Sequence, residues 1–182
     1  MSAETMHAGV VIIGGGPVGA TLALALAIDG IPSMVLEARA KGASHHDQRA
    51  LALSYGSRQI LQRLGVWQDI APAATAINTI HISQRGSLGR SLLRAEDQQQ
   101  EALGYVVSYG TLTRALDQAL ALRPEVDVRY DAEVQEVTPG MPVSRVRFEF
   151  QGVGQALDCE LAVLADGGRT LGEIAGLHRR SE

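Results

Sequence analysis

Three glycines and one carboxylate are spaced for binding a dinucleotide. Gly14, Gly16 and Gly19 stand in the order G-x-G-x-x-G, and Glu37 follows further along the chain. In such a site the first glycine permits a sharp turn, the second lets a pyrophosphate approach the backbone, and the third lets a helix pack closely. An acidic side chain about 20 residues further on binds the hydroxyls of the adenosine ribose. This spacing therefore predicts a nucleotide site.

The residues around the glycines predict the elements that must position them. Residues 10–13 are an uninterrupted β-branched run, typical of a buried parallel strand. Pro17 suits the first turn of a helix, which we expect to continue to residue 28 and to stop at Gly30. Residues 34–36 form a second strand, which ends at Glu37. The alternative is an ordinary β-α-β unit with a surface glutamate. The strand before the glycines, the helix after them and the acid at the end of the second strand together favour a dinucleotide site. A carboxylate at the position of Glu37 favours FAD or NAD over NADP.

Composition places the chain among ordinary globular proteins. The formal net charge is −4, so nucleic acid is not an expected partner. Cys159 is the only cysteine, which excludes an internal disulfide, and we interpret it as a structural residue. No basic segment precedes the first apolar run, and residues 18–28 are too few to span a bilayer. We therefore expect a cytoplasmic location, with the apolar helix buried in the fold.

The rest of the chain mixes helices with strands of two kinds. After a disordered start at residues 1–8, we expect helices at 55–64 and 111–122 and a short turn at 67–70. Ser54 would cap the first of these helices, and Gly65 would end it. Strands are predicted at 79–85, 90–95, 105–108, 127–130, 133–137, 144–150 and 161–165. The predicted fold class is α/β, a Rossmann-like FAD-binding domain with a parallel sheet and inserted antiparallel strands.

Other polar residues carry weaker signals for chemistry. The adjacent His45 and His46 lack the spacing of a metal site and are interpreted as a solvated loop, so no metal is predicted. His81 is expected on a partly exposed strand face. From the residues alone, Arg49 could be a surface arginine, and Asp166 could simply end a strand at an Asp-Gly turn. No Ser-His-Asp arrangement stands out, so no catalytic residue is assigned.

The chain resembles the FAD-dependent aromatic hydroxylases built like para-hydroxybenzoate hydroxylase. The shared landmarks are the glycine motif, the Arg49 segment after the ribose acid, and Ala165-Asp166-Gly167 at the end of a late strand. Within this family it is most similar to the ubiquinone-biosynthesis hydroxylases, and among these to the hydroxylases of 2-polyprenyl-6-methoxyphenol. The stretches that carry this closer similarity are residues 47–53, 64–67, 75–83, 95–97 and 102–104.

The resemblance implies a role for each candidate residue. Gly14, Gly16 and Gly19 would face the FAD pyrophosphate, Glu37 the adenosine ribose, and Arg49 the phosphates. The backbone near Val134 would lie against adenine. Asp166 and Gly167 would contact both FAD and the nicotinamide nucleotide. The implied chemistry is reduction of the flavin by NAD(P)H, reaction with O₂, and transfer of one oxygen to a phenol ring.

The chain also departs from the family. Thr170 and Glu173 stand where many members have Ser and Arg, and Gly110 replaces an arginine that often precedes the second helix. The resemblance covers only the front half of a member, without the second glycine-aspartate motif and the substrate-capping sheet. We therefore interpret residues 1–182 as an FAD-binding domain from a longer architecture, inactive alone and prone to self-association.

Two other functions stay open at this point. One is a nucleotide-binding or assembly module without catalysis, and the other is a hydroxylase of a small soluble aromatic acid. The expected substrate is a polyprenylated phenol, whose apolar tail would call for a position beside the inner membrane or in a biosynthetic complex.

Overall fold

The computed structural model describes residues 6–83 and 90–168. The chain forms two compact units, and each is described by itself. The first unit combines Met1–Ala43 with Leu116–Glu182, and the second consists of Ser44–Ala115. The first unit is thus built from two segments that lie far apart in the sequence. Thr170 and Glu173 lie outside the described residues.

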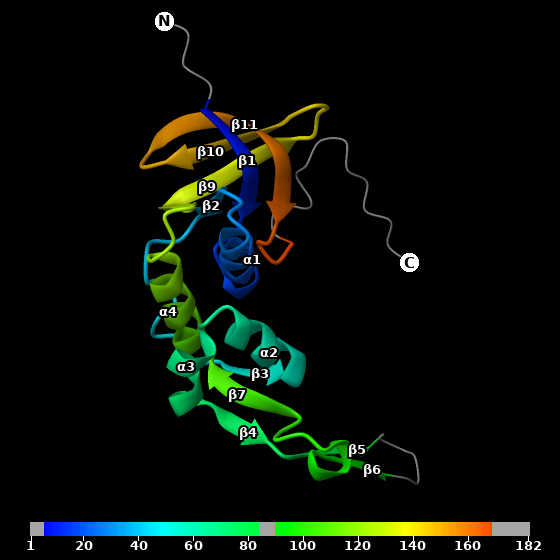
Figure 1. The fold of residues 1–182 in the computed structure, drawn as a ribbon. Helices are drawn as coiled ribbons and strands as arrows, with labels where there is room; N and C mark the ends of the chain where they lie inside the picture. The colour runs from blue at the N-terminus through cyan, green and yellow to red at the C-terminus, as the bar shows by residue number, and fades with distance from the viewer. Residues whose placement is uncertain (1–5, 84–89, 169–182) are drawn as a thin grey trace, which may run out of the picture. The chain divides into compact units, whose positions relative to one another are not determined.

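The first unit contains a six-stranded sheet with the order β8-β2-β1-β11-β10-β9 (Figure 1). The first four strands of this order are parallel, and β10 and β9 continue the sheet in antiparallel pairing. The predicted α/β fold with inserted antiparallel strands is confirmed. The strands are β1 Met6–Ile13, β2 Ser33–Glu37, β8 Val126–Tyr130, β9 Ala132–Thr138, β10 Ser144–Phe150 and β11 Val153–Leu164.

Residues 11–13 of β1 and all of β2 are buried, as their apolar runs predict. Val11 and Ile13 belong to a core cluster that β9, β10 and β11 complete with the fully buried Val146, Phe148 and Leu157. Ile12 points the other way, and its Cγ2 lies 3.1 Å from the position of a Cβ on Gly19, in α1. The sheet therefore has a helix on one face of β1 and the antiparallel strands folded against the other.

Helix α1, Pro17–Ile28, begins and ends where the sequence predicts. Gly30 has φ +71°, and the N–H groups of Gly30 and Ile31 donate to the carbonyls of Ala27 and Leu26, which closes the helix with a Schellman motif. The expectation that this helix is buried is wrong at its ends, since Val18 is 71% exposed and Ile28 49%. The small residues Ala20, Ala23 and Ala27 face the sheet and let the helix approach it closely.

The second unit contains a three-stranded antiparallel sheet with the order β3-β7-β4 and a separate hairpin of β5 and β6. Ser54 caps α2 by accepting a hydrogen bond from the Ser57 N–H, and Gly65 ends it with φ +77°, as predicted. The elements are β3 Ala50–Ser54, α2 Tyr55–Arg63, α3 Trp67–Ile70, η1 Ala71–Ala73, β4 Thr75–Ile77, β5 Thr79–Ser83, β6 Arg90–Arg94, η2 Glu96–Gln98 and β7 Gly104–Ser108.

Several boundaries differ from the prediction. Helix α4, Tyr109–Leu120, starts earlier than expected because the Ser108 hydroxyl accepts a hydrogen bond from the Thr111 N–H. Strands β3 and β4 were not predicted. Strand β11 begins at Val153 rather than at residue 161, and β1 already begins at Met6, within the stretch expected to be disordered. The last two residues of the predicted strand 79–85 lie outside the described part.

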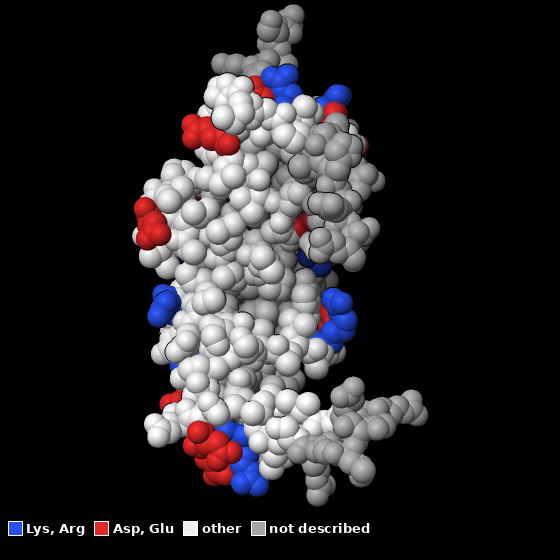
Figure 2. Space-filling model, turned by 90° about the vertical axis from the view of Figure 1, so that its right-hand side faces the viewer, with Lys and Arg blue, Asp and Glu red and all other residues white. Residues whose placement is uncertain are grey.

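Charged side chains are distributed in small groups. Figure 2 shows separate clusters of basic and acidic atoms on the face that it displays, with most of the described surface formed by other residues. Ion pairs occur among the described residues, such as that of Arg145 with Asp158 across β10 and β11. Among the described residues, no helix combines the length and the apolar character needed to cross a membrane.

Candidate functional site

The glycine turn between β1 and α1 is built against the end of β11. Gly14 has φ +104°, a conformation that favours glycine, and its N–H donates to the Leu36 carbonyl at 2.8 Å. A Cβ at Gly14 would lie 2.7 Å from the Ala165 carbonyl oxygen. Because backbone occupies that position, a side chain cannot be accommodated. The first glycine of the motif is therefore required by both conformation and space.

Gly19 brings α1 onto this turn. A Cβ at Gly19 would overlap the carbonyl oxygen of Gly14. Gly16 is different, since its φ of −66° and ψ of −177° are open to any residue. The backbone conformation of Gly16 therefore does not require a glycine. A glycine would be needed at this position only if a ligand approaches the backbone closely, as the motif predicts. Gly16 is also the N-cap of α1 and supplies no side-chain cap, so the helix start presents backbone N–H groups.

Glu37 ends β2 with its carboxylate turned to the glycine turn. Its Oε2 accepts a hydrogen bond from the Gly15 N–H at 2.7 Å, and its Oε1 accepts from the backbone N and the Nε of Arg39 at 2.9 and 2.8 Å. The residue is only 7% exposed. Burial alone would raise the pKa of Glu37, but the hydrogen bonds from Arg39 and Gly15 outweigh it and hold the pKa below its ordinary value. Glu37 is therefore an ionised acceptor fixed beside the turn.

Asp166 and Gly167 follow β11 at the same edge of the sheet. The Ala165 N–H donates to the Ile13 carbonyl at 2.7 Å, and the Asp166 N lies 2.8 Å from the position of a Cβ on Gly14. The Asp166 Oδ1 accepts a hydrogen bond from the Gly168 N–H, and Gly167 has φ +75°. The structure thus brings Asp166 and Gly167 together with Gly14 and with the turn that Glu37 contacts.

Val134 lies in β9, four residues after Tyr130, which pairs with Glu37 across β8 and β2. It pairs with Phe148, and its side chain packs against the core cluster. The register changes here, because Phe148 pairs with Val134 whereas Arg147 pairs with Glu136, which leaves Gln135 as the extra residue of a β-bulge. The predicted contact between this backbone and adenine stays a prediction.

Tyr130 is the neighbour of Glu37 on the adjacent strand β8. The two residues pair across β2 and β8, and the Tyr130 hydroxyl donates to Asp117 at 3.2 Å. Burial, together with the charges of Asp117 and Glu37, raises the pKa of Tyr130 above its ordinary value of 10.0. Tyr130 is therefore a neutral hydrogen-bond donor beside the acidic group.

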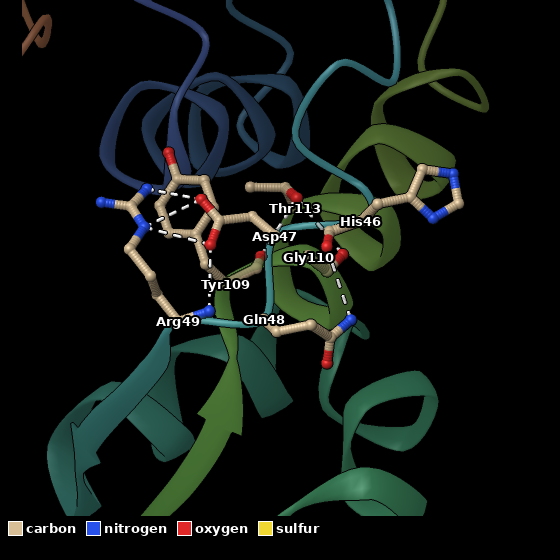
Figure 3. A network of polar contacts seen from close by, with 7 residues as sticks. All are labelled: His46, Asp47, Gln48, Arg49, Tyr109, Gly110 and Thr113. Carbon is tan, nitrogen blue, oxygen red and sulfur yellow. Dashed lines mark hydrogen bonds and ion pairs between the residues drawn. The ribbon is translucent and has the colours of Figure 1, made fainter.

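Arg49 lies in the second unit, in a loop fixed to the start of α4. Figure 3 shows its guanidinium against the Asp47 carboxylate and over the ring of Tyr109. Tyr109 and Gly110 donate their backbone N–H groups to the carbonyls of Arg49 and Asp47, each at 2.8 Å. The side chain of Arg49 remains 72% exposed. Its predicted contact with FAD phosphates stays a prediction.

The sequence analysis missed several residues that hold these groups. Gly15 and Arg39 bind Glu37, and Asp47 and Tyr109 hold Arg49. Arg39 stands two positions after Glu37 and Asp47 two positions before Arg49, and this spacing could have been noticed in the sequence. Cys159 is fully buried, and burial raises the pKa of its thiol, which agrees with its interpretation as a structural residue.

A glycine turn at the carboxyl ends of parallel strands, with an acid on the second strand, defines a Rossmann-like dinucleotide-binding fold. Residues 7–182 match the model of the FAD binding domain family, and the chain belongs to this family. FAD is its cofactor. The groups described above fit such a molecule: Gly14 and Gly19 leave no room for a Cβ, the α1 start presents N–H groups, and a carboxylate lies beside the turn.

The chain is similar to three curated relatives over part of their length. It is 32% identical to the uncharacterized protein slr1300 of Synechocystis sp., covering 88% of this chain and 39% of that protein. It is 29% identical to the ubiquinone hydroxylase UbiL of Rhodospirillum rubrum, covering 96% and 41%. It is also 29% identical to the para-nitrophenol 4-monooxygenase of Pseudomonas sp., covering 92% and 41%. The resemblance to the FAD-dependent aromatic hydroxylases is confirmed.

A solved structure has the same fold. The chain is similar to p-nitrophenol 4-monooxygenase PnpA of Pseudomonas putida, with a TM-score of 0.80 and 23% identity. The similarity covers 98% of this chain and 46% of that one. The chain spans about two fifths of the length of the curated relatives that it matches.

Proposed function

We propose that the whole protein is an FAD-dependent monooxygenase that hydroxylates a polyprenylated phenol in ubiquinone biosynthesis, using NAD(P)H and O₂. The observation that supports FAD binding is the buried Glu37 carboxylate, held 2.7 Å from the Gly15 N–H beside the glycine turn. The similarity to UbiL supports the substrate class. The described residues would form the FAD-binding part of this longer protein.

In this proposal each residue has a specific task. The turn at Gly14, Gly16 and Gly19 and the start of α1 receive the pyrophosphate, whose charge the helix dipole favours. Glu37 accepts hydrogen bonds from the adenosine ribose in exchange for part of its contact with Arg39, whose Nη2 lies 3.4 Å from Oε2. Bound flavin supplies the redox chemistry, in which NAD(P)H reduces it and O₂ provides the oxygen for the phenol ring.

Three further groups complete the proposed contacts. Arg49 supplies positive charge to the phosphates, and the Val134 backbone contacts adenine. Asp166 and Gly167 border both the flavin and the nicotinamide nucleotide. The catalytic residue for ring hydroxylation is unassigned.

We further propose that the apolar tail of the substrate places the whole protein at the inner membrane or in a complex that presents the tail.

FAD binding is tested by titration with flavin fluorescence. Gly16→Val puts a branched side chain where the pyrophosphate must approach and should abolish binding, while Gly9→Ala serves as a control because nothing lies within 4 Å of its Cβ position. Equal affinity of the Gly16→Val variant and the unchanged protein would refute the assignment. A protein that binds neither FAD nor NAD would instead indicate an assembly module without catalysis.

The substrate is tested in the cell. Deletion of the parent gene should cause a prenylated, methoxylated phenol to accumulate and ubiquinone to disappear. The similarity to para-nitrophenol 4-monooxygenase favours a second candidate, a hydroxylase of a small aromatic compound. Normal ubiquinone levels in a strain without a redundant hydroxylase would support that candidate against the first.

The reaction is also proposed to need residues outside these 182, because the curated relatives are more than twice as long as the matched part. NAD(P)H oxidation by residues 1–182 should therefore show no dependence on an added short-chain polyprenylphenol. Substrate-dependent turnover by this chain would contradict this part of the proposal.

A further inference from the structure

The Glu37 carboxylate accepts four hydrogen bonds, which use the full acceptor capacity of its two oxygens. Oε1 accepts from the backbone N and from Nε of Arg39, at 2.9 and 2.8 Å. Oε2 accepts from the Gly15 N–H at 2.7 Å and from Nη2 of Arg39 at 3.4 Å. Within the described residues 6–83 and 90–168, these are the donors that reach this carboxylate. A nucleotide can therefore bind Glu37 only by replacing one or more of them.

Two of these donors belong to the backbone, and the other two belong to one side chain. The backbone donors are the N–H groups of Gly15 and Arg39. A Cβ on Gly15 would lie 3.0 Å from the Cβ of Glu37, so the turn packs directly against this side chain. The backbone bonds thus fix the carboxylate without help from the guanidinium. The side chain of Arg39 is 41% exposed, and it can leave Glu37 without a change in the turn.

The guanidinium of Arg39 takes one acceptor site on each oxygen of Glu37. Its Nε donates to Oε1 and its Nη2 to Oε2, which is the pattern of a bidentate arginine pair. An adenosine ribose also presents two neighbouring donors, its hydroxyl groups, to an acid at the end of the second strand. The guanidinium and the ribose would therefore compete for the same two acceptor sites.

The ionised Glu37 needs these donors when no nucleotide is bound. The residue is 7% exposed, and a buried charge without hydrogen-bond partners is strongly unfavourable. The neighbouring strand β8 does not supply a donor, because the Tyr130 hydroxyl donates to Asp117 at 3.2 Å. Arg39 meets this need, since it follows Glu37 by two residues and its side chain reaches back to the carboxylate.

We propose that the Arg39 side chain is a placeholder for the adenosine ribose, which pairs with Glu37 in the empty site and is displaced by the two hydroxyls of the bound nucleotide. This inference rests on the proposed role of Glu37 towards FAD, and it adds a residue that sets the affinity of the site. Arg39 stabilises the empty protein and opposes the binding of the cofactor. The backbone bonds from residues 15 and 39 stay in place in both states.

The first test measures the dissociation constant of FAD by the quenching of flavin fluorescence. Arg39→Met removes the guanidinium but keeps the backbone N–H and a long side chain, and it should tighten binding about threefold. The direction is informative, because the loss of a positive charge near a diphosphate would by itself weaken binding. In a Glu37→Ala background, where neither the ribose nor the guanidinium has its acceptor, Arg39→Met should give no gain.

Thermal unfolding separates this role from a purely structural one. Without FAD, Arg39→Met should lower the melting temperature, because the empty protein loses its ion pair with Glu37. In saturating FAD, the variant and the unchanged protein should melt together, because the pair is already broken in the complex and tighter binding offsets the lower stability.

A matched control is available in the same unit. Nε and Nη2 of Arg145 donate to the two oxygens of Asp158, at 2.7 and 2.9 Å, which is the same bidentate pattern between β10 and β11. Arg145→Met removes the same charge from a pair that no nucleotide displaces in this proposal. It should change neither the FAD affinity nor the increase in melting temperature that FAD causes.

Several outcomes would overturn the inference. Weaker FAD binding by Arg39→Met would show that Arg39 supports the cofactor, and unchanged affinity would show that the pair persists in the complex. The same gain in the Glu37→Ala background would show that Arg39 acts away from this carboxylate. An equal loss of melting temperature with and without FAD would indicate a purely structural pair. Failure of the proposed ribose contact gives a different result, because Glu37→Ala alone would then leave the FAD affinity unchanged.

Discussion

The backbone N–H of Gly15 donates to Oε2 of Glu37 over 2.7 Å, although 22 positions separate the two residues in the sequence. This bond connects the glycine turn after β1 to the end of β2. It makes the ribose acid part of the turn that is proposed to receive the pyrophosphate. Loss of the carboxylate should therefore affect both folding and ligand binding.

Glu37→Gln should lower the free energy of unfolding by about 1–2 kcal/mol, because bonds from Arg39 and Gly15 to a charged group become bonds to a neutral one. Urea denaturation without ligand measures this change. Glu96→Gln is the control, since Glu96 forms an exposed pair with Arg94 at 3.6 Å and should change stability by less than about 0.5 kcal/mol. Equal effects of the two substitutions would contradict the structural role of Glu37.

The pKa of Glu37 also predicts a pH dependence. Because the native pKa lies below the ordinary 4.5, the unfolded chain binds more protons than the native chain near that pH. The contribution of Glu37 to stability is therefore present above pH 4.5 and is lost as the pH falls through the native pKa. Glu37→Gln should flatten the stability curve in this acidic range, and an unchanged slope would argue against an ionised Glu37.

Gly19→Ala should destabilise the protein by about 2–3 kcal/mol, because the new methyl group would overlap the Gly14 carbonyl and force α1 away from the turn. Gly9→Ala in β1 has no neighbour within 4 Å of the new Cβ and should be neutral. Thermal unfolding of the two variants compares them directly. A Gly19→Ala variant as stable as Gly9→Ala would mean that α1 packs differently.

Tyr130 predicts a second pH dependence, in the alkaline range. Its native pKa is raised above 10.0, so at higher pH the unfolded chain loses a proton that the native chain keeps. Stability should fall as the pH rises above 10, and Tyr130→Phe should remove that part of the fall. Tyr55→Phe, in α2, should leave the alkaline loss in place. A Tyr130→Phe variant with the full loss would exclude Tyr130 as its cause.

If the chain self-associates as predicted, we expect the β5–β6 hairpin to take part. Ile80 and Leu93 pair on one face of this hairpin and are 39% and 38% exposed, with Ile82 nearby at 52%. Replacing both Ile80 and Leu93 by Thr should shift the sedimentation profile towards the monomer, because the apolar face is lost. Ile60→Thr on α2 removes a single exposed side chain and should not. A profile unchanged by the double substitution would place the contact elsewhere.

The sequence predicted the elements whose signals are local. The G-x-G-x-x-G turn, the Ser54 cap and the Gly65 stop each depend on residues within a few positions, and all three are present. The strands that were missed depend on distant partners. Ala50 in β3 pairs with Ser108 in β7, and the short β3 consists of Ala, Leu and Ser without a β-branched or aromatic residue.

The same distinction applies to the candidate site. The types and spacing of Gly14 and Glu37 identify a dinucleotide turn, but two of the groups that hold Glu37 and Arg49, Gly15 and Tyr109, are not apparent in the sequence. Gly15 looks like part of a glycine run, and Tyr109 is far from Arg49 along the chain. Residues 157–160 are strand-like in the sequence, and in β11 their apolar members Leu157 and Cys159 are buried, whereas residues 153–156, which include Gly154 and Gln155, were not predicted.

The division of the first unit into two chain segments has a consequence for synthesis on the ribosome. Strand β1 pairs along its length with β11, from Met6 opposite Leu157 to Ile13 opposite Leu164. The β1 edge therefore stays open while the whole second unit is translated, and closing so long a loop slows folding. An apolar strand exposed for that time can pair with other chains. Nascent chains that stop before β11 should therefore depend on chaperones, which bind such edges.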